Sequence, residues 1–175
     1  MTAAALAEQV GIADGTIFRH FKDKEAIVAA AIDIFEAALE ETFPPRGGEP
    51  LDRLGSFVVK RLMVVRENPE LLRLAFNDRL AEAAGEEGAA RVERLVGRSV
   101  AFIRDCLAEA QRKGQVTQGA PVMLLTWMVI GVVRGASTTG HHGATGLRTL
   151  ANTSPKNVWR ELEQFLRHTA EEPTS

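Results

Sequence analysis

A short run of donor side chains near the N-terminus has the residue types and spacing that suit contact with a nucleic acid. Thr16 and His20 lie one helical turn apart, and Arg19 follows Thr16 by three residues, so the three share one face of a helix. Arginine can bind the edge of a guanine with two hydrogen bonds. A helix that begins at Lys24 would offer backbone amides to a phosphate. The alternative is a solvated basic face with no ligand.

Residues that could support catalysis lack the companions that catalysis needs. Cys106 has no histidine near it in the sequence, and His141–His142 has no carboxylate at metal-ligand spacing. The segment 140–146 is rich in glycine but lacks the lysine of a phosphate-binding loop. We therefore expect no enzyme, no metal site and no cofactor. Cys106 is expected to be a buried, unreactive thiol.

Helical periodicity dominates the chain, whereas the alternation of a strand is nearly missing, so we expect an all-α fold. Gly11, the pair Pro44–Pro45 and Gly114 are expected to end helices, and Ser154 before Pro155 is expected to begin one. We expect a domain boundary near Phe43. The predicted helices cover about 2–10, 14–20, 24–43, 51–67, 69–84, 89–113, 121–138 and 154–169, with a break at 85–88.

The segment Leu6–Phe21 has the spacing of a helix-turn-helix, in which one short helix supports a second in the major groove. Ala7 permits close helix crossing, and Gly11 can adopt a left-handed turn. The run TAAALAEQVGIADGTIFRHFKDKE, residues 2–25, resembles the DNA-binding signature of the tetracycline-repressor (TetR/AcrR) family of bacterial transcriptional regulators. The helix order after residue 51 is similar to the ligand-binding and dimerisation domain of that family.

The resemblance implies a helix-turn-helix DNA-binding domain over 1–43 and a helical ligand-binding and dimerisation domain over 44–175. Phe18 stands where the family usually has tyrosine, and Ala13 replaces the usual serine cap. The family has a further helix before Thr2, so either the sequence is incomplete at its start or DNA binding has been lost. The implied DNA-binding residues are Thr2, Asp14, Gly15, Thr16, Phe18, Arg19, His20 and Lys24.

Large apolar side chains after residue 51 could line a cavity for an unknown small-molecule effector, although core packing is the alternative for each of them. Four polar residues lie on or near the apolar faces and could orient such a ligand: Arg61, Arg104, Thr126 and Arg134. The effector-pocket residues that we predict are Phe57, Arg61, Phe76, Phe102, Trp127 and Met128.

Two apolar helices are the candidates for a homodimer interface, which the family builds from four helices. Gly131 and Gly135 are four residues apart and permit close approach of a second helix. Burial within a single chain is the competing interpretation. The predicted interface residues are Ile130, Gly131, Arg134, Gly135, Trp159, Leu162, Phe165 and Leu166.

Composition places few limits on this hypothesis. The net charge of -2 gives no general attraction to DNA, so any contact must be local. The apolar run between Ala120 and Val133 is shorter than the roughly 20 residues that span a bilayer, and no secretory signal is evident. We expect a cytoplasmic, ligand-responsive repressor that binds a double-stranded DNA operator as a homodimer. The alternative is a ligand-binding dimer of the same fold that does not bind DNA.

Overall fold

The structure is a computed structural model that describes residues 24–67, 78–138 and 153–168. These residues form helices joined by short turns, and the described ranges contain no strand, which confirms the predicted all-α class. The helices are α3 (Lys24–Glu40), α4 (Pro50–Glu67), α6 (Asp78–Arg112), α7 (Val122–Thr138) and α9 (Pro155–His168).

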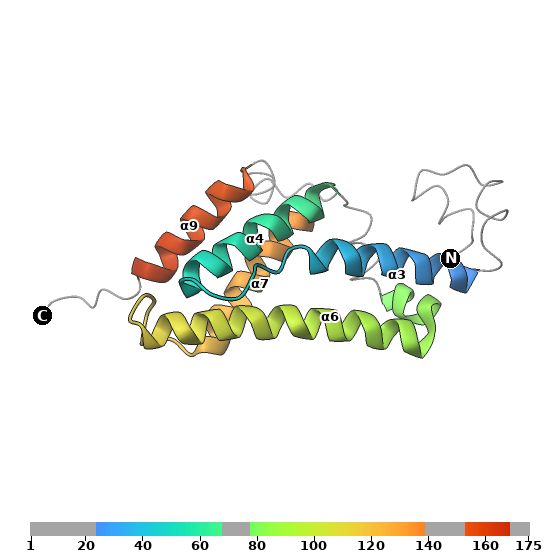
Figure 1. Ribbon diagram of the computed structural model, residues 1–175, viewed down its shortest axis with the longest axis horizontal. Coiled ribbons are helices and arrows are strands. Elements are labelled where there is room, and N and C mark those ends of the chain that lie inside the picture. The colour runs from blue at the N-terminus through green and yellow to red at the C-terminus, as the bar shows by residue number, and fades with distance from the viewer. Residues whose placement is uncertain (1–23, 68–77, 139–152, 169–175) are drawn as a thin grey trace, which may run out of the picture.

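The long helix α6 runs along one side of the molecule, and the other helices are arranged on it (Figure 1). α3 and α4 follow one another along the length of α6, and both contact it. α7 packs against both α4 and α6, whereas α9 packs against α4. α6 thus contacts α3 as well as α4 and α7.

One apolar core joins α4, α6, α7 and α9. It is centred on α4, where Leu54, Phe57 and Val58 are almost completely buried because apolar residues recur on one face. Leu107 of α6 is fully buried in the same core, as expected for a long amphipathic helix. The remaining members are Leu51, Leu62, Ile103, Cys106, Ala110, Val116, Leu125, Val129, Val158, Leu162 and Leu166.

A glycine sets the close approach of α4 and α9. A Cβ atom added to Gly55 would lie 2.4 Å from Nε1 and 2.6 Å from Cε2 of Trp159, which is closer than van der Waals contact allows. The indole ring of Trp159 therefore packs directly on the backbone of α4. A side chain at this position would therefore require the indole of Trp159 to shift.

Two predicted helix boundaries have the expected local structure. Gly114 has a φ of +69° after the end of α6, and the amide of Gln115 donates to the carbonyl of Ala110 at 2.9 Å, as in a Schellman motif. The Ser154 hydroxyl accepts a hydrogen bond from the amide of Asn157 at 3.3 Å, which caps α9. Both boundaries follow from local side-chain chemistry.

The predicted break at residues 85–88 is wrong, because α6 continues through Gly85 and Gly88. A glycine inside a helix costs only about 1 kcal/mol relative to alanine. The alanines and glutamates around these two glycines are strong helix formers, and no proline interrupts them. The helix expected over 69–84 is therefore, from Asp78 onward, part of α6.

Candidate functional site

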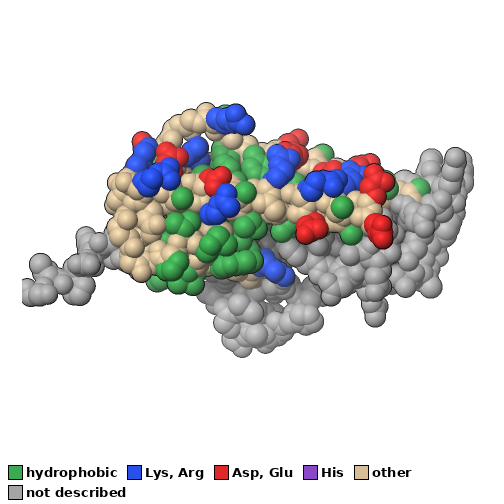
Figure 2. Space-filling view, turned by 90° about the horizontal axis from the view of Figure 1, so that it is seen from below, with side chains coloured by type: hydrophobic (Ala, Val, Ile, Leu, Met, Phe, Trp, Pro, Cys, Tyr) green, Lys and Arg blue, Asp and Glu red, His purple; other side chains and the backbone are tan. Residues whose placement is uncertain are grey.

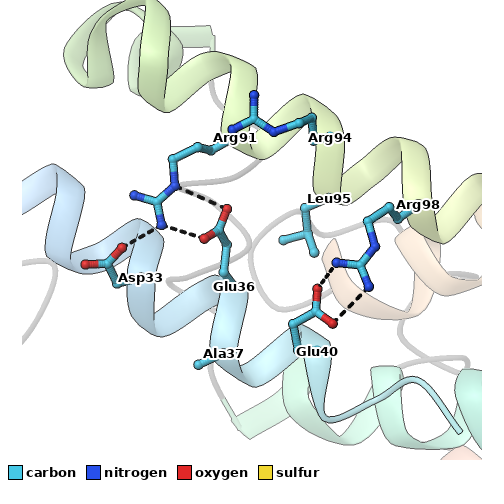
Figure 3. A pocket seen from close by; sticks show the side chains of 8 residues that line it. All are labelled: Asp33, Glu36, Ala37, Glu40, Arg91, Arg94, Leu95 and Arg98. Carbon is cyan, nitrogen blue, oxygen red and sulfur yellow. Dashed lines mark hydrogen bonds and ion pairs between the residues drawn. The ribbon is translucent and has the colours of Figure 1, made fainter. Parts of the chain in front are cut away.

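Ion pairs join α3 to α6 along the cleft between them (Figure 3). The guanidinium of Arg91 on α6 lies 2.6 Å from a carboxylate oxygen of Asp33 and 2.5 Å from one of Glu36, both on α3. Further along the same two helices, Arg98 binds both carboxylate oxygens of Glu40, one of them at 3.0 Å. We call these three pairs the α3–α6 ion pairs. The two carboxylates bonded to Arg91 raise the pKa of that guanidinium.

The cleft has a volume of about 440 Å³ and is lined by equal numbers of acidic and basic side chains. Arg94 also lines it, but its side chain points away from the acids of α3. Leu95, on the floor of the cleft, packs with Leu39 and Val64 in a small apolar cluster separate from the main core. Among the described side chains, α3 therefore contacts α6 through ion pairs and through a small apolar cluster.

A buried arginine of α4 and three phenylalanine rings form a second group of interest. The rings of Phe43, Phe57 and Phe102 lie 4.9–5.6 Å apart, centre to centre. The guanidinium carbon of Arg61 lies 4.6 Å from the centre of the Phe57 ring and 5.5 Å from that of Phe43, within cation–π range. We call these four residues the Arg61 cluster.

The charge of Arg61 is buried with few polar partners. Its residue surface is only 6% exposed, its Nη2 donates to the Ser99 hydroxyl at 3.1 Å, and its Nε has no hydrogen-bond partner. Burial lowers the pKa of Arg61 to about 10, against the opposing effect of the Glu40 charge. The guanidinium thus keeps its charge at neutral pH in apolar surroundings.

The structure brings together three of the six predicted pocket residues, namely Phe57, Arg61 and Phe102. Met128 is half-buried against the main core. Trp127 does not join them, because it is 57% exposed on the outer face of α7. Phe76 lies outside the described residues.

Apolar side chains are exposed on α7 and α9. On α7, Leu124 is 53% exposed, and with Trp127, Gly131 and Arg134 it follows helical spacing along one exposed face. On α9, Phe165 is 49% exposed. Figure 2 shows hydrophobic side chains gathered on one part of the surface, beside the charged side chains that lie along α6. We call the exposed apolar residues of α7 and α9 the apolar face.

Other predicted interface residues pack within their own chain. Leu162 and Leu166 belong to the main core, and Trp159 is half-buried against Gly55. Ile130 and Gly135 are also half-buried. A Cβ atom on Gly131 would meet no atom within 4 Å, so this glycine faces open space in the single chain.

The predicted DNA-binding residues fall almost entirely outside the described part of the chain. Lys24 is the first residue of α3. Thr2, Asp14, Gly15, Thr16, Phe18, Arg19 and His20 all precede α3 and lie outside the described residues.

Sequence reasoning misses several residues of these sites. It marks Phe43 only as a domain boundary and gives no role to Ser99. Arg91, Arg94 and Arg98 recur at intervals of three and four on α6, which is a signal of a common face. The acids on α3 recur in the same way. Each of them pairs with an arginine more than fifty residues away in the sequence, so no local pattern could show the pairing.

Within the three described ranges, no helix has both the length and the hydropathy to cross a membrane. The same ranges contain no group of three or more His, Cys, Asp or Glu side chains that could hold a metal ion. Cys106 is buried, as expected, and burial raises the pKa of its thiol to about 11.

Comparison with known proteins points to one family. Residues 1–31 match the family model described as "Bacterial regulatory proteins, tetR family". The chain is 24% identical over 164 residues to the nucleoid occlusion factor SlmA of Marinomonas sp. (strain MWYL1), covering 92% of this chain and 80% of that protein. It is 26% identical over 139 residues to the fatty acid metabolism regulator protein of Bacillus subtilis (strain 168), covering 77% and 70%.

Solved structures share the fold. The TetR-family transcriptional regulator PfmR of Thermus thermophilus superposes with a TM-score of 0.66 at 17% identity, covering 98% of this chain and 90% of that one. The transcriptional regulator FadR of Bacillus subtilis, in complex with stearoyl-CoA, superposes with a TM-score of 0.57 at 18% identity, covering 97% and 88%. At these identities the likeness establishes the fold.

Proposed function

We propose that the chain is a ligand-responsive repressor of the tetR family of bacterial regulatory proteins, on the premise that residues 1–31 match the model of that family. It would bind operator DNA as a homodimer in the cytoplasm and release the DNA when a small molecule occupies the body. The observation that carries this proposal is the family match over residues 1–31, which runs directly into α3.

Residues 1–43 would form the DNA-binding domain and residues 44–175 the effector and dimerisation domain. α3 begins inside the family match and ends next to Phe43, and it packs on α6 along the α3–α6 ion pairs. A shift of α6 in response to a ligand would therefore move α3 and the segment before it. A coupling of about 1 to 3 kcal/mol is typical of allostery and is enough to change operator occupancy.

The apolar face supports the homodimer. Large apolar side chains such as Leu124, Trp127 and Phe165 are about half exposed or more in the single chain, which is unfavourable unless a partner covers them. The open space around Gly131 would admit a helix of a second copy. A two-fold dimer would present two DNA-binding segments to two half-sites.

Comparison also supports a small-molecule effector. FadR of Bacillus subtilis is a transcriptional regulator with the same fold that was crystallised with stearoyl-CoA, and AibR was crystallised with isovaleryl coenzyme A and operator DNA. In this chain three of the predicted pocket residues, Phe57, Arg61 and Phe102, contact one another, which supports an effector site at this place.

DNA binding is tested by fluorescence anisotropy with the full chain. Labelled fragments are first selected from the genomic region upstream of its gene, and the selected fragment is titrated with wild type, Arg19→Ala and His20→Ala. We expect each substitution to weaken binding about tenfold or more, because charged contacts to bases and phosphates contribute about 1–3 kcal/mol each.

Arg104→Ala is the matched control, because Arg104 is exposed, pairs with Asp105 on α6 and lies outside the family match. It should bind DNA like wild type. No selectable fragment, or equal binding by wild type and both N-terminal variants, would favour the alternative of a ligand-binding dimer without DNA binding.

The oligomeric state is tested by light scattering coupled to size-exclusion chromatography. Trp127→Glu places a charge among the exposed apolar residues of α7 and should convert a dimer to a monomer, because an unpaired buried charge is strongly unfavourable at an interface. Met63→Glu is the control, since Met63 is also exposed but lies on α4. A monomeric wild type, or a dimeric Trp127→Glu variant, would contradict the proposed interface.

A further inference from the structure

Four polar residues on apolar faces could orient an effector, and one of them differs from the other three in its burial and charge. Arg104 is exposed and paired with Asp105, and the Thr126 hydroxyl donates to the carbonyl of Val122 at 2.8 Å. Arg134 is exposed. Arg61 alone of the four is a buried charge.

No carboxylate neutralises Arg61 within ion-pair distance in the described part of the chain. The nearest acidic influence is Glu40, whose carboxylate is bound by Arg98 instead. Arg53 on the same helix also has a buried Nε without a partner, but its guanidinium forms an ion pair with Glu109. Buried charges in proteins are normally paired, so Arg61 is the exception on α4.

The immediate partners of Arg61 leave hydrogen-bonding capacity unused. Ser99 is neutral, and its hydroxyl is itself bonded to the carbonyl of Leu95 at 3.0 Å. The Nε of Arg61 is enclosed and bonded to nothing. An anion at this position would gain a charge-assisted hydrogen bond and would neutralise the buried guanidinium.

The surroundings of Arg61 determine the rest of the ligand's chemistry. The rings of Phe43, Phe57 and Phe102 enclose the guanidinium on its apolar side. Such rings favour an aliphatic or aromatic group over a sugar or a second charge, because polar groups buried without partners are costly. The ligand should therefore combine one anionic head with an apolar body.

We propose that Arg61 binds the anionic head group of an apolar effector, with the head at the guanidinium and the apolar part among the phenylalanine rings; this rests on the proposed ligand-responsive function. A carboxylate and a phosphate monoester share the required chemistry.

The cleft between α3 and α6 adjoins this site through the Phe43 ring. Arg98 lines the cleft, and its guanidinium carbon lies 5.2 Å from the centre of the Phe43 ring, the same ring that Arg61 contacts. A head group that displaces Phe43 would therefore also disturb the Arg98–Glu40 pair, which belongs to the α3–α6 ion pairs.

The test is calorimetric binding to the full chain without DNA. The probes are straight-chain alkanoates from hexanoate to hexadecanoate, the matching alkyl phosphates and the matching alkanols. We expect wild type to bind at least one acid or phosphate about tenfold or more tightly than the alcohol of equal length. Whether the acid or the phosphate binds better identifies the head group.

Arg61→Met should remove this preference while leaving alcohol binding similar, and Arg61→Lys should retain part of it, because lysine keeps the charge but loses the planar fork. Arg104→Met is the control and should behave like wild type. Circular dichroism checks the fold of each variant. If Arg61→Met unfolds, the preference of wild type for anionic probes and its partial loss in Arg61→Lys still test the proposal.

A wild type that binds no probe, or that binds acids, phosphates and alcohols equally, would overturn the proposal, as would a folded Arg61→Met that keeps the full preference. Because DNA is absent, these outcomes are independent of the anisotropy test. If the chain prefers the anionic probe but binds no DNA, the proposal of a repressor is contradicted. If it binds DNA but shows no preference for the anionic probe, only the proposed role of Arg61 is contradicted.

Discussion

The two ends of α6 are held in different ways. Around Leu107, α6 packs into the main apolar core with α4, α7 and α9. Around Arg91 and Arg98, it meets α3 through ion pairs, beside which Leu95 packs with Leu39 and Val64 in a small apolar cluster. Apolar burial is not screened by salt, whereas exposed ion pairs are screened and contribute little each.

This difference suits the proposed repressor, in which the main core would stay fixed while α3 shifts. The main core would resist displacement, because close-packed interiors have few alternative arrangements. The α3–α6 ion pairs could break and re-form at small cost, so α3 is the element that a ligand could shift.

The largest effect should come from emptying the main core. Leu107→Ala should lower the free energy of unfolding by about 2–5 kcal/mol, because it leaves a cavity among fully buried side chains. Leu95→Ala makes the same change on the same helix beside the cleft and should cost less, because its neighbours can collapse into the space. Urea unfolding measures both, and equal losses would remove the distinction between the two ends.

The next effect concerns the contact between α4 and α9. Gly55→Ala should lower stability by about 1–3 kcal/mol, because the added methyl group overlaps the indole of Trp159. Gly97→Ala on α6 is the control, since nothing lies within 4 Å of its Cβ position, and it should raise stability by about 0.5–1 kcal/mol. If Gly55→Ala were as stable as wild type, close packing of α9 on α4 would be wrong.

A pH effect tests burial at the core end of α6. Burial raises the pKa of the Cys106 thiol from its ordinary value near 9 to about 11. Between these values the folded chain holds a proton that the unfolded chain releases, so stability should fall as the pH rises from 9 to 11, by about 1–2 kcal/mol. Cys106→Ala should show a smaller slope in urea unfolding over this range, and an identical slope would contradict the shift.

The smallest effect on stability should come from the α3–α6 ion pairs. Arg91→Ala should lower Tm by about 2 °C or less at low salt, because ion pairs that stay partly open to solvent contribute little. The difference from wild type should shrink further in 1 M NaCl, where the screening length is about 3 Å. Arg167→Ala, which removes an exposed pair with Glu163 within α9, is the control. A large decrease in Tm that does not change with salt would contradict the distinction between the ion pairs of α3 and the apolar packing of the main core.

Much of the fold could be predicted from local chemistry. Apolar periodicity located α3, α4, α7 and α9 to within a few residues, and Gly114 and Ser154 marked helix ends because their roles depend only on neighbours in the chain. The break at Gly85–Gly88 was wrong because a weak local preference was outweighed by strong helix formers on both sides.

The candidate sites were less accessible to sequence reasoning. Periodicity identified Phe57, Arg61 and Phe102 as inward residues but could not show that Phe43 and Ser99 meet them. It also could not distinguish Trp127, which is exposed, from Leu166, which is buried in its own chain. Helical spacing defines a face, and only packing decides whether that face meets the core or solvent.

The all-α class, the family signature over the first residues and most helix boundaries could be predicted from the sequence, because they depend on residues close together in the chain. The tertiary structure alone decided that Arg91 and Arg98 meet acids on α3 and that Arg61 is buried without a carboxylate. These pairings join residues far apart in sequence, and their charges and distances are set by how the helices pack rather than by any local pattern.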